Sequence, residues 1–332
     1  MPDALRWRSL SYSTSYPANE VGQVVTLTLN PTIDGASETD VVHPTLKIRT
    51  RNDRYNPGGG GINVARVVSR LGGDVRAVYM AGGATGGVLD ELLDAADIYR
   101  QRISIAGHTR ISLNVFERAS GQEYRFVPEG PMISTADVDA CRELFANIDC
   151  DYLVLSGSLP RGAPDDFYAQ LAEKSSARVI VDSSGPALKA AVDASSTFLI
   201  KPSRGELEKL CGRQLPTIED IEKAARALVQ TGKCENVAVT LGHDGALLAN
   251  ASGSFFLPAI PVNASSAVGA GDSFVGGMIH ALALGQSMEE AFRLGLAAAT
   301  ATVLSPGTDL CRKPDVERLL MQVPATSPRA NP

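Results

Sequence analysis

The sequence predicts an α/β protein in which helices cover a mostly parallel central sheet. Between residues 136 and 249, short runs rich in Val, Ile and Leu alternate with segments of helical length. Such runs are typical of buried strands, and strands that alternate with helices form parallel sheets with right-handed crossovers. Polar or glycine-rich residues follow several of these runs. That is the edge at which open α/β sheets bind their ligands.

The composition is that of an ordinary globular protein. The chain has 332 residues, 44% of them hydrophobic and 20% charged, which is enough for one large core. A net charge of −6 argues against a nucleic-acid surface. Five cysteines without a C-x-x-C pair fit a reducing cytoplasm. No run has the ~18–20 apolar residues of a membrane span, and residues 1–20 lack the apolar core of a signal peptide.

In the first part of the chain, residues 21–29 read as a buried strand and residues 58–71 as a helix. A strand at 75–80 and a helix at 88–96 follow. Asp34 lies just past the first strand, where α/β sheets place ligand contacts. The alternative for Asp34 is the acid of an ordinary Asx-turn.

Three segments do not fit the alternation of strands and helices. Residues 41–56 are polar, extended and rich in Lys and Arg, which is typical of a solvated edge and not of a core strand. Residues 109–116 and 123–127 alternate with period 2, and residues 119–122 join them as a hairpin. Because a hairpin alone is unstable in water, it should pair with another surface.

From residue 136 onward the pattern is regular. The predicted helices are 136–146, 165–173, 205–210 and 218–230, and the predicted strands are 152–155, 178–181, 197–200, 236–241 and 246–249. The segment Gly269-Ala270-Gly271-Asp272 follows an extended run at 257–263 and begins a helix that continues to about residue 284.

The start of that helix suggests chemistry. A helix N-terminus offers unpaired N–H groups and about half a positive charge, and small residues let a phosphate approach these groups. An acid in this place, Asp272, could take the proton of an attacking hydroxyl during phosphoryl transfer. The alternative is a glycine turn capped by an acid.

A second glycine cluster begins a helix about 200 residues upstream: Asn56-Pro57-Gly58-Gly59-Gly60-Gly61-Ile62-Asn63-Val64-Ala65-Arg66. With both segments present, residues 24–320 resemble the PfkB (ribokinase-like) carbohydrate kinase family. The resemblance implies a ribokinase-like three-layer α/β/α domain over residues 21–323, flanked by tails at 1–20 and 324–332. It also implies a small β-sheet lid, formed by about 40–56 and 109–128, through which two chains form a homodimer.

The resemblance implies ATP and Mg²⁺ as cofactors and assigns roles to residues. The catalytic set is Gly269, Ala270, Gly271 and Asp272. The substrate set is Asp34, Lys47, Gly59, Gly60, Asn63, Arg110, Arg125 and Ser158, with Arg125 a candidate for the partner's site. The nucleotide set is Lys201, Ser203, Glu206, Thr240, Gly242 and Gly245, with Glu206 binding Mg²⁺ through water.

The chain departs from the family pattern at three places. Ser203 stands where an Asn is expected, which affects the magnesium site. Ala267 stands where the family commonly has a Thr, which removes a possible hydroxyl contact. Pro306 lies where relatives bind potassium, so the resemblance implies K⁺ less strongly than Mg²⁺. These departures motivate one alternative, a protein that binds sugar or nucleotide without turnover.

The expected reaction is the glycolytic phosphorylation of fructose 6-phosphate. The reason is Gly60, because relatives that act on fructose 1-phosphate or tagatose 6-phosphate usually carry Lys at that place. A 1-phosphofructokinase or tagatose-6-phosphate kinase is therefore the alternative enzyme.

Overall fold

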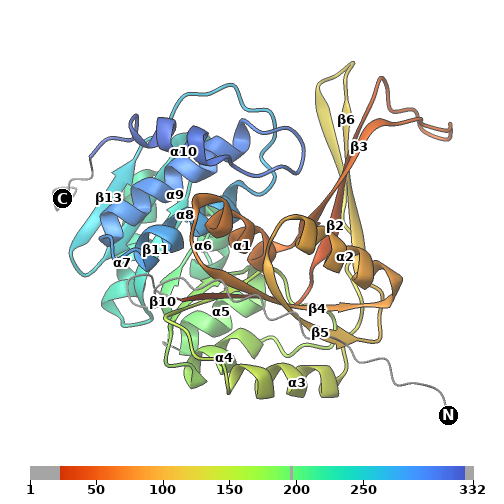
Figure 1. Ribbon diagram of the computed structural model, residues 1–332. Coiled ribbons are helices and arrows are strands. Elements are labelled where there is room, and N and C mark those ends of the chain that lie inside the picture. The colour runs from red at the N-terminus through yellow and green to blue at the C-terminus, as the bar shows by residue number, and fades with distance from the viewer. Residues whose placement is uncertain (1–22, 195–196, 326–332) are drawn as a thin grey trace, which may run out of the picture.

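The computed structural model describes residues 23–194 and 197–325, and the strands within these ranges form two sheets. The larger sheet has nine strands (Figure 1). Across the sheet they are β13 (Gly253–Leu257), β12 (Ala246–Asn250), β11 (Cys234–Thr240), β10 (Thr197–Ile200), β9 (Arg178–Asp182), β8 (Tyr152–Ser156), β1 (Val24–Thr28), β4 (Val75–Gly82) and β5 (Tyr99–Ile105). Neighbouring strands are parallel, except that β12 is antiparallel to β11 and β13.

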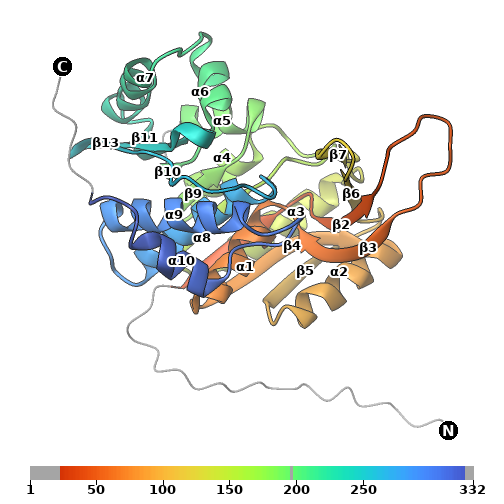
Figure 2. The same cartoon turned by 90° about the horizontal axis from the view of Figure 1, so that it is seen from above.

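Helices cover both faces of this sheet, as Figure 2 shows. One layer contains α1 (Gly60–Leu71), α2 (Gly83–Ala95), α8 (Ala270–Ala283), α9 (Met288–Val303) and α10 (Lys313–Leu320). The other contains α3 (Thr135–Phe145), α4 (Phe167–Lys174), α5 (Gly185–Ala194), α6 (Arg204–Cys211) and α7 (Ile218–Gln230).

Alternate strand residues supply the two cores between these layers. In β8, Tyr152 and Val154 pack with α1, α8 and α9, whereas Leu153 and Leu155 pack with α4 and α5. Since successive side chains of a strand point to opposite faces, a sheet covered on both sides needs apolar residues at nearly every position. That requirement explains the unbroken apolar runs in the sequence.

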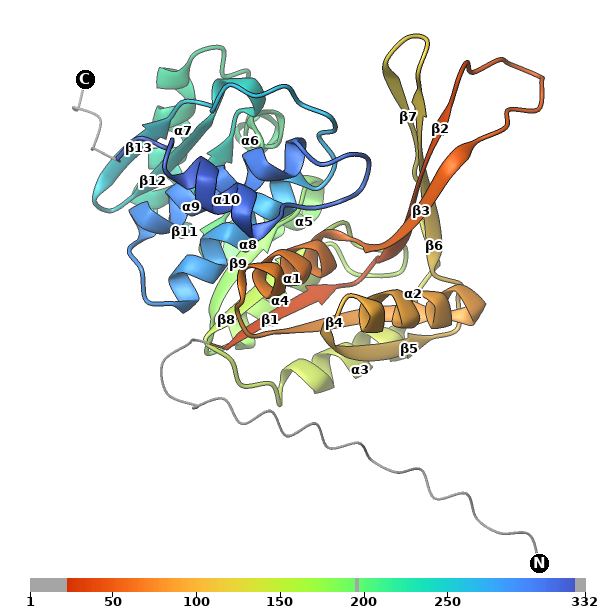
Figure 3. The ribbon, with the colours of Figure 1, turned by 45° about the horizontal axis from the view of Figure 1, so that its top comes forward.

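The smaller sheet stands beside the main body (Figures 1 and 3). Its order is β3 (Arg51–Gly58), β2 (Thr32–Thr39), β6 (Arg110–Glu117) and β7 (Gln122–Phe126). β2 runs parallel to β6 and antiparallel to β3, and β6 and β7 form the predicted hairpin. Residues 41–50, which were expected to be extended, contain no strand and connect β2 to β3 at the outer end of the sheet.

Several elements differ from the sequence-based expectation. Asp34 lies inside β2, not past a strand end, and β2 escaped notice because Thr32–Thr39 has no apolar alternation. β5 was missed because it is an edge strand with three polar residues near its start. α2 begins at Gly83 rather than at residue 88, since its glycine-rich first turn resembles a loop. α5, α9 and α10 were not predicted.

The proposed N-terminal tail, residues 1–20, lies outside the described residues, as does most of the C-terminal one. Among the helices of the described ranges, none is both long and apolar enough to cross a membrane.

Candidate active site

The carboxyl ends of β1, β8, β9, β10 and β11 lie side by side, because these strands are parallel neighbours. Polar residues end or follow four of them: Ser156 ends β8, Asp182 ends β9, Lys201 follows β10 and Thr240 ends β11. Ligands of open α/β sheets bind at this edge. The fold therefore gathers residues from distant parts of the sequence in one place.

The N-terminus of α8 supplies backbone donors. Its N-cap is Gly269, whose φ of 75° is left-handed and favours glycine. An ideal Cβ at Gly269 would also lie 2.5 Å from Leu310 Cδ2. The N–H groups of Gly271 and Asp272 lie in the first turn, where the helix offers no carbonyl partner. Ala270 N donates to Ala267 O at 3.4 Å, a long bond.

The two glycine-rich segments meet at Asp272. Asn63 of α1 donates from Nδ2 to Asp272 Oδ2 at 2.8 Å, although 209 residues separate them in the chain. α1 and α8 pack against each other through apolar residues such as Val64, Val67 and Val275. This packing places the N-terminal ends of both helices side by side.

Asp272 is half-buried, and the loss of solvation that comes with burial is the main reason that its pKa is raised to about 7. The charge of Asp182 adds to the increase, and that of Asp34 adds less. The bond from Asn63 and the charge of Lys201 act in the opposite direction. A carboxylate with a pKa near 7 is a better proton acceptor than an ordinary Asp and is still ionised in part at neutral pH.

Asp182 and Lys201 form a buried ion pair beside this carboxylate. Lys201 Nζ lies 3.1 Å from Asp182 Oδ1, and both side chains are almost inaccessible to solvent. Burial opposes the charge on Lys201, but Asp182 and Glu206 outweigh it and keep the pKa of Lys201 above its usual value. An ideal Cβ on Gly271 would lie 3.3 Å from Lys201 Nζ, so the ammonium group borders the N-terminus of α8.

The glycines of the first cluster let their backbone approach neighbouring polar side chains closely, on the other side of Asp272 from the ion pair. An ideal Cβ on Gly58 would lie 2.0 Å from Asp34 Oδ2, and one on Gly60 would lie 2.3 Å from Ser156 Oγ. Asp34 accepts a hydrogen bond of 3.0 Å from Ser112 Oγ. Burial raises the pKa of Asp34, and nearby arginines counteract part of this effect.

Arg110 and Arg125 are among those arginines, and both belong to the small sheet. Arg110 donates to Asn30 O at 2.8 Å and to Pro128 O at 2.9 Å, so backbone carbonyls already hold its guanidinium. Asn30 also donates to Ser158 Oγ at 3.5 Å, which places Ser158 on the same side of the site. Arg125 is exposed and paired with Asn114 across the sheet, on the face that carries Asp34.

The expected nucleotide residues lie at the ends of β10 and β11. Ser203 and Glu206 form a capping box at the N-terminus of α6, in which Ser203 N donates to Glu206 Oε2 at 2.7 Å. Thr240 N donates to Pro202 O at 3.0 Å, so Thr240 lies beside Ser203. Gly242 and Gly245 bracket the 3₁₀ turn η1 (Gly242–Asp244) that follows, with the backbone of Gly245 against Leu257.

Lys47 does not reach this site within one chain. The small sheet pairs Gly58 with Thr32 near the cleft and Arg51 with Glu38 at the far end. Seven residues of strand span roughly 23 Å, and exposed Lys47 lies in the connection beyond Arg51.

Two residues at the site were not among the predicted ones. Asp182 belongs to the strand-end segment Asp182-Ser183-Ser184-Gly185, whose position at a strand end was its signal. Arg66 donates to Asn63 Oδ1 at 3.1 Å, and its place one helical turn after Asn63 was the only sign of this contact in the sequence.

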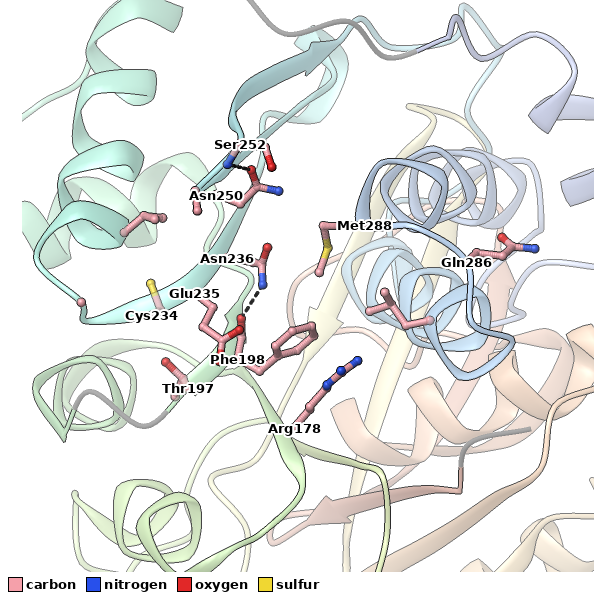
Figure 4. A pocket seen from close by; sticks show the side chains of 14 residues that line it. Arg178, Thr197, Phe198, Cys234, Glu235, Asn236, Asn250, Ser252, Gln286 and Met288 are labelled. Atoms are coloured by element: carbon pink, nitrogen blue, oxygen red, sulfur yellow. Dashed lines mark hydrogen bonds between the residues drawn. The ribbon is translucent and has the colours of Figure 1, made fainter. Parts of the chain in front are cut away.

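One cavity of the described residues lies away from this site. Its volume is about 710 Å³, and Arg178, Phe198, Glu235 and Asn250 help to line it (Figure 4). Arg178 begins β9 and Asn250 ends the antiparallel β12, so the cavity lies at the opposite edge of the sheet. A second cavity, of about 550 Å³, lies between the small sheet and residues 306–309, and Asn56 and Asn114 help to line it.

The fold and this arrangement define a class of enzyme. Residues 27–315 match the model of the pfkB family carbohydrate kinases, and the chain belongs to that family. It is thus an ATP-dependent sugar kinase with the ribokinase-like fold. A ribokinase from Thermotoga maritima, 24% identical, shares the fold with a TM-score of 0.72 over 90% of this chain and 99% of its own.

More similar relatives carry a more specific name. The ATP-dependent 6-phosphofructokinase isozyme 2 of Mycobacterium tuberculosis (strain H37Rv) is 42% identical over 89% of this chain and 88% of its own. That of Escherichia coli K12 is 40% identical over 90% and 97%. The crystal structure of phosphofructokinase-2 from Escherichia coli with fructose-6-phosphate matches with a TM-score of 0.86 and 38% identity, over 91% of this chain and 99% of the other.

Proposed function

We propose that this enzyme transfers the γ-phosphoryl group of ATP to the free primary hydroxyl of fructose 6-phosphate and forms fructose 1,6-bisphosphate and ADP. The observation that carries the proposal is the 2.8 Å contact between Asn63 and Asp272, which joins the sugar-side glycine cluster to a half-buried carboxylate at the N-terminus of α8. The relatives named 6-phosphofructokinase isozyme 2 support the choice of sugar.

In the proposed reaction, the hydroxyl oxygen attacks the γ-phosphorus while the bond from this phosphorus to the β–γ bridging oxygen breaks. Asp272 accepts the hydroxyl proton, and ADP leaves. Negative charge on the transferring group faces the amides of Gly271 and Asp272, and Lys201 lies beside them. Donors that are already oriented stabilise the transition state without the cost of reorganisation.

The acceptor lies between the first glycine cluster and the polar face of the small sheet in this proposal. Asp34 and Asn63 bind sugar hydroxyls, the backbone at Gly59 and Gly60 lies against the sugar, and Ser158 adds a hydroxyl contact. Arg110 and Arg125 bind the phosphate that the sugar already carries, a task that suits the fork of a guanidinium.

Gly60 is the residue that distinguishes fructose 6-phosphate from the two alternative acceptors. The ideal Cβ of any side chain there would meet Ser156 Oγ at 2.3 Å and Gly157 N at 2.9 Å. A side chain at position 60 would therefore require these neighbours to move, and this chain lacks the Lys that relatives acting on fructose 1-phosphate or tagatose 6-phosphate usually carry. This supports fructose 6-phosphate over 1-phosphofructokinase activity, the function named for relatives of 31–35% identity.

Glu206 is the residue that fits an indirect role at Mg²⁺. Mg²⁺ usually retains several waters and needs only one or two carboxylates together with substrate phosphates. In the described ranges no group of three His, Cys, Asp or Glu residues could hold a metal. Bound Mg²⁺ would neutralise charge on the phosphates of ATP. Potassium is a second candidate ion, since a phosphofructokinase-2 structure from Escherichia coli contains it.

A homodimer is the proposed assembly, formed through the outer face of the small sheet. Tyr55, Gly35, Leu113 and Phe126 are cross-strand neighbours on that face, and the three large side chains are 46–58% exposed. An apolar row of this kind on one side of a four-stranded sheet is typical of an interface. A phosphofructokinase-2 of Escherichia coli has been described as a tetramer in an inhibited form, so the larger assembly is an outcome to measure.

The proposal can be tested by measuring ADP release with fructose 6-phosphate, fructose 1-phosphate, tagatose 6-phosphate and no acceptor, each with and without K⁺. We expect the highest kcat/KM for fructose 6-phosphate, and Asp272→Asn should lower kcat at least ~10²-fold. A preference for another acceptor would transfer the assignment to that sugar. An absence of turnover with every acceptor would favour a binding protein without catalysis.

A further inference from the structure

Arg66 is a buried cation whose direct partners are uncharged. It is 2% exposed, and among the described residues no carboxylate forms an ion pair with it. Burial lowers the pKa of Arg66 to about 10, which leaves it protonated at neutral pH. Because a buried charge without a direct counter-ion costs several kcal/mol, its retention calls for a role.

The guanidinium of Arg66 joins two elements of the site. Its Nη1 donates to Pro57 O at 2.9 Å and to Asn63 Oδ1 at 3.1 Å, and its Nη2 donates to Asn56 Oδ1 at 3.3 Å. Asn63 lies on α1, whereas Asn56 and Pro57 belong to β3 of the small sheet. Asn56 in turn donates to Thr308 Oγ1 at 3.0 Å.

The contact with Asn63 has a consequence for Asp272. An Asn side chain has one acceptor oxygen and one donor nitrogen. Since Arg66 occupies the oxygen, the NH₂ group must face the other way, where it donates to Asp272 Oδ2 at 2.8 Å. If the amide rotated by half a turn, its oxygen would face the carboxylate and repel it.

We propose that Arg66 is a positioning residue for phosphoryl transfer, which fixes the amide of Asn63 so that it donates to Asp272 and holds that carboxylate toward the acceptor hydroxyl. This inference rests on the proposed function, because it presumes that Asp272 is the proton acceptor. Arg66 itself touches neither substrate nor the reacting atoms.

The simpler explanation is that Arg66 only ties β3 to α1. Arg70 offers a matched comparison, because it lies one turn further along α1 and donates to Leu310 O and Cys311 O at 2.8 and 3.3 Å. It also ties α1 to another loop, with an ion pair of 3.1 Å to Asp309 in addition, but no bond joins it to Asn63 in the described structure. A structural tie should therefore behave alike at both positions.

The decisive experiment is a double-mutant cycle in the full-length enzyme with Arg66→Met, Asn63→Ala and the double variant. Arg66→Met should lower kcat/KM for fructose 6-phosphate on the order of 10²-fold, the scale of a misplacement of ~1 Å, and leave the KM for ATP within about twofold. If Arg66 acts through Asn63, its replacement in the Asn63→Ala background should cost less than about threefold.

Arg70→Met is the control. It should lower the melting temperature and leave kcat/KM within about twofold, since surface ties affect stability more than geometry at the site. Should Arg66→Met fail to fold, Arg66→Lys serves in the same cycle, because Lys keeps the charge and loses the fork. Losses that multiply in the double variant, or an Arg66 variant with normal kcat/KM, would overturn the inference.

The outcomes separate the two proposals. If the wild-type enzyme turns over none of the sugar phosphates, or if Asp272→Asn retains its activity, the proposed function is wrong. If the wild type is active, Asp272→Asn is inactive and the Arg66 and Asn63 losses multiply, the function stands and only the positioning role of Arg66 is refuted.

Discussion

Replacing Asp272 with Asn should stabilise the protein while it removes activity. The carboxylate is half-buried, and its pKa is raised from 3.8 to about 7, chiefly by the loss of solvation. A raised pKa means that the folded state disfavours the ionised form, so this carboxylate lowers the free energy of unfolding wherever the unfolded chain is ionised. A neutral Asn of nearly the same shape avoids that cost.

The magnitude depends on pH in a defined way. Below about pH 3.8 both states are protonated and the cost vanishes. Between pH 3.8 and about 7 it grows by about 1.4 kcal/mol per pH unit, and above pH 7 it is constant. The cost is therefore about 1–2 kcal/mol at pH 5 and about 4 kcal/mol at pH 8. Asp272→Asn should gain roughly 2–3 kcal/mol more at pH 8 than at pH 5.

Urea denaturation at pH 5 and pH 8, at one protein concentration, measures this difference. Asp74→Asn removes the same charge from an exposed position and serves as the control. Its effect should stay within ~0.5 kcal/mol at both values of pH. An equal effect of Asp272→Asn at pH 5 and pH 8, or a loss of stability that grows with pH, would show that Asp272 does not carry a raised pKa.

Three further perturbations probe the site and the assembly. Asn63→Ala removes a hydrogen-bond donor that lowers the pKa of Asp272. The acid limb of the kcat/KM–pH profile should therefore move from near pH 7 to higher pH by about 1–2 units, because such a bond usually contributes about 1.5–3 kcal/mol. An unchanged acid limb would contradict the contact. Gly269→Ala places a Cβ on a residue with φ 75° and only 2.5 Å from Leu310 Cδ2. It should lower the free energy of unfolding in urea by about 1–3 kcal/mol and should also lower kcat. The control Gly121→Ala, in an open turn, should leave kcat unchanged. Phe126→Glu places a charge in the apolar row of the small sheet, so the proposed dimer should dissociate into monomers in sedimentation experiments. Tyr99→Glu changes a similarly exposed aromatic residue on β5, outside that row, and should leave the dimer intact.

Much of the main domain could be predicted because its signals are local. The apolar runs of β8, β9 and β11 and the glycine-rich starts of α1 and α8 identify themselves within a few residues. The small sheet was harder. β2 is short of apolar residues, and its residues 36–38 help to line the cavity of about 550 Å³. Its pairing with β6 is therefore not indicated by a hydrophobic pattern. The sequence alone offers no rule for such a strand.

The site itself was only half accessible to sequence reasoning, and the reason is burial of charge. Charged residues are usually exposed, so the sequence favours a solvated turn at Asp182 as much as a buried ion pair. For Arg66 the sequence offers only its spacing of one helical turn from Asn63 as a sign of a role at the site. Only the fold places Asp182, Lys201 and Arg66 within the field of Asp272. Each of them would be costly alone, and together they compensate one another in part. Their charges do not fully offset the cost of ionising Asp272, so its pKa stays raised. A raised pKa is the property that a proton acceptor at neutral pH requires.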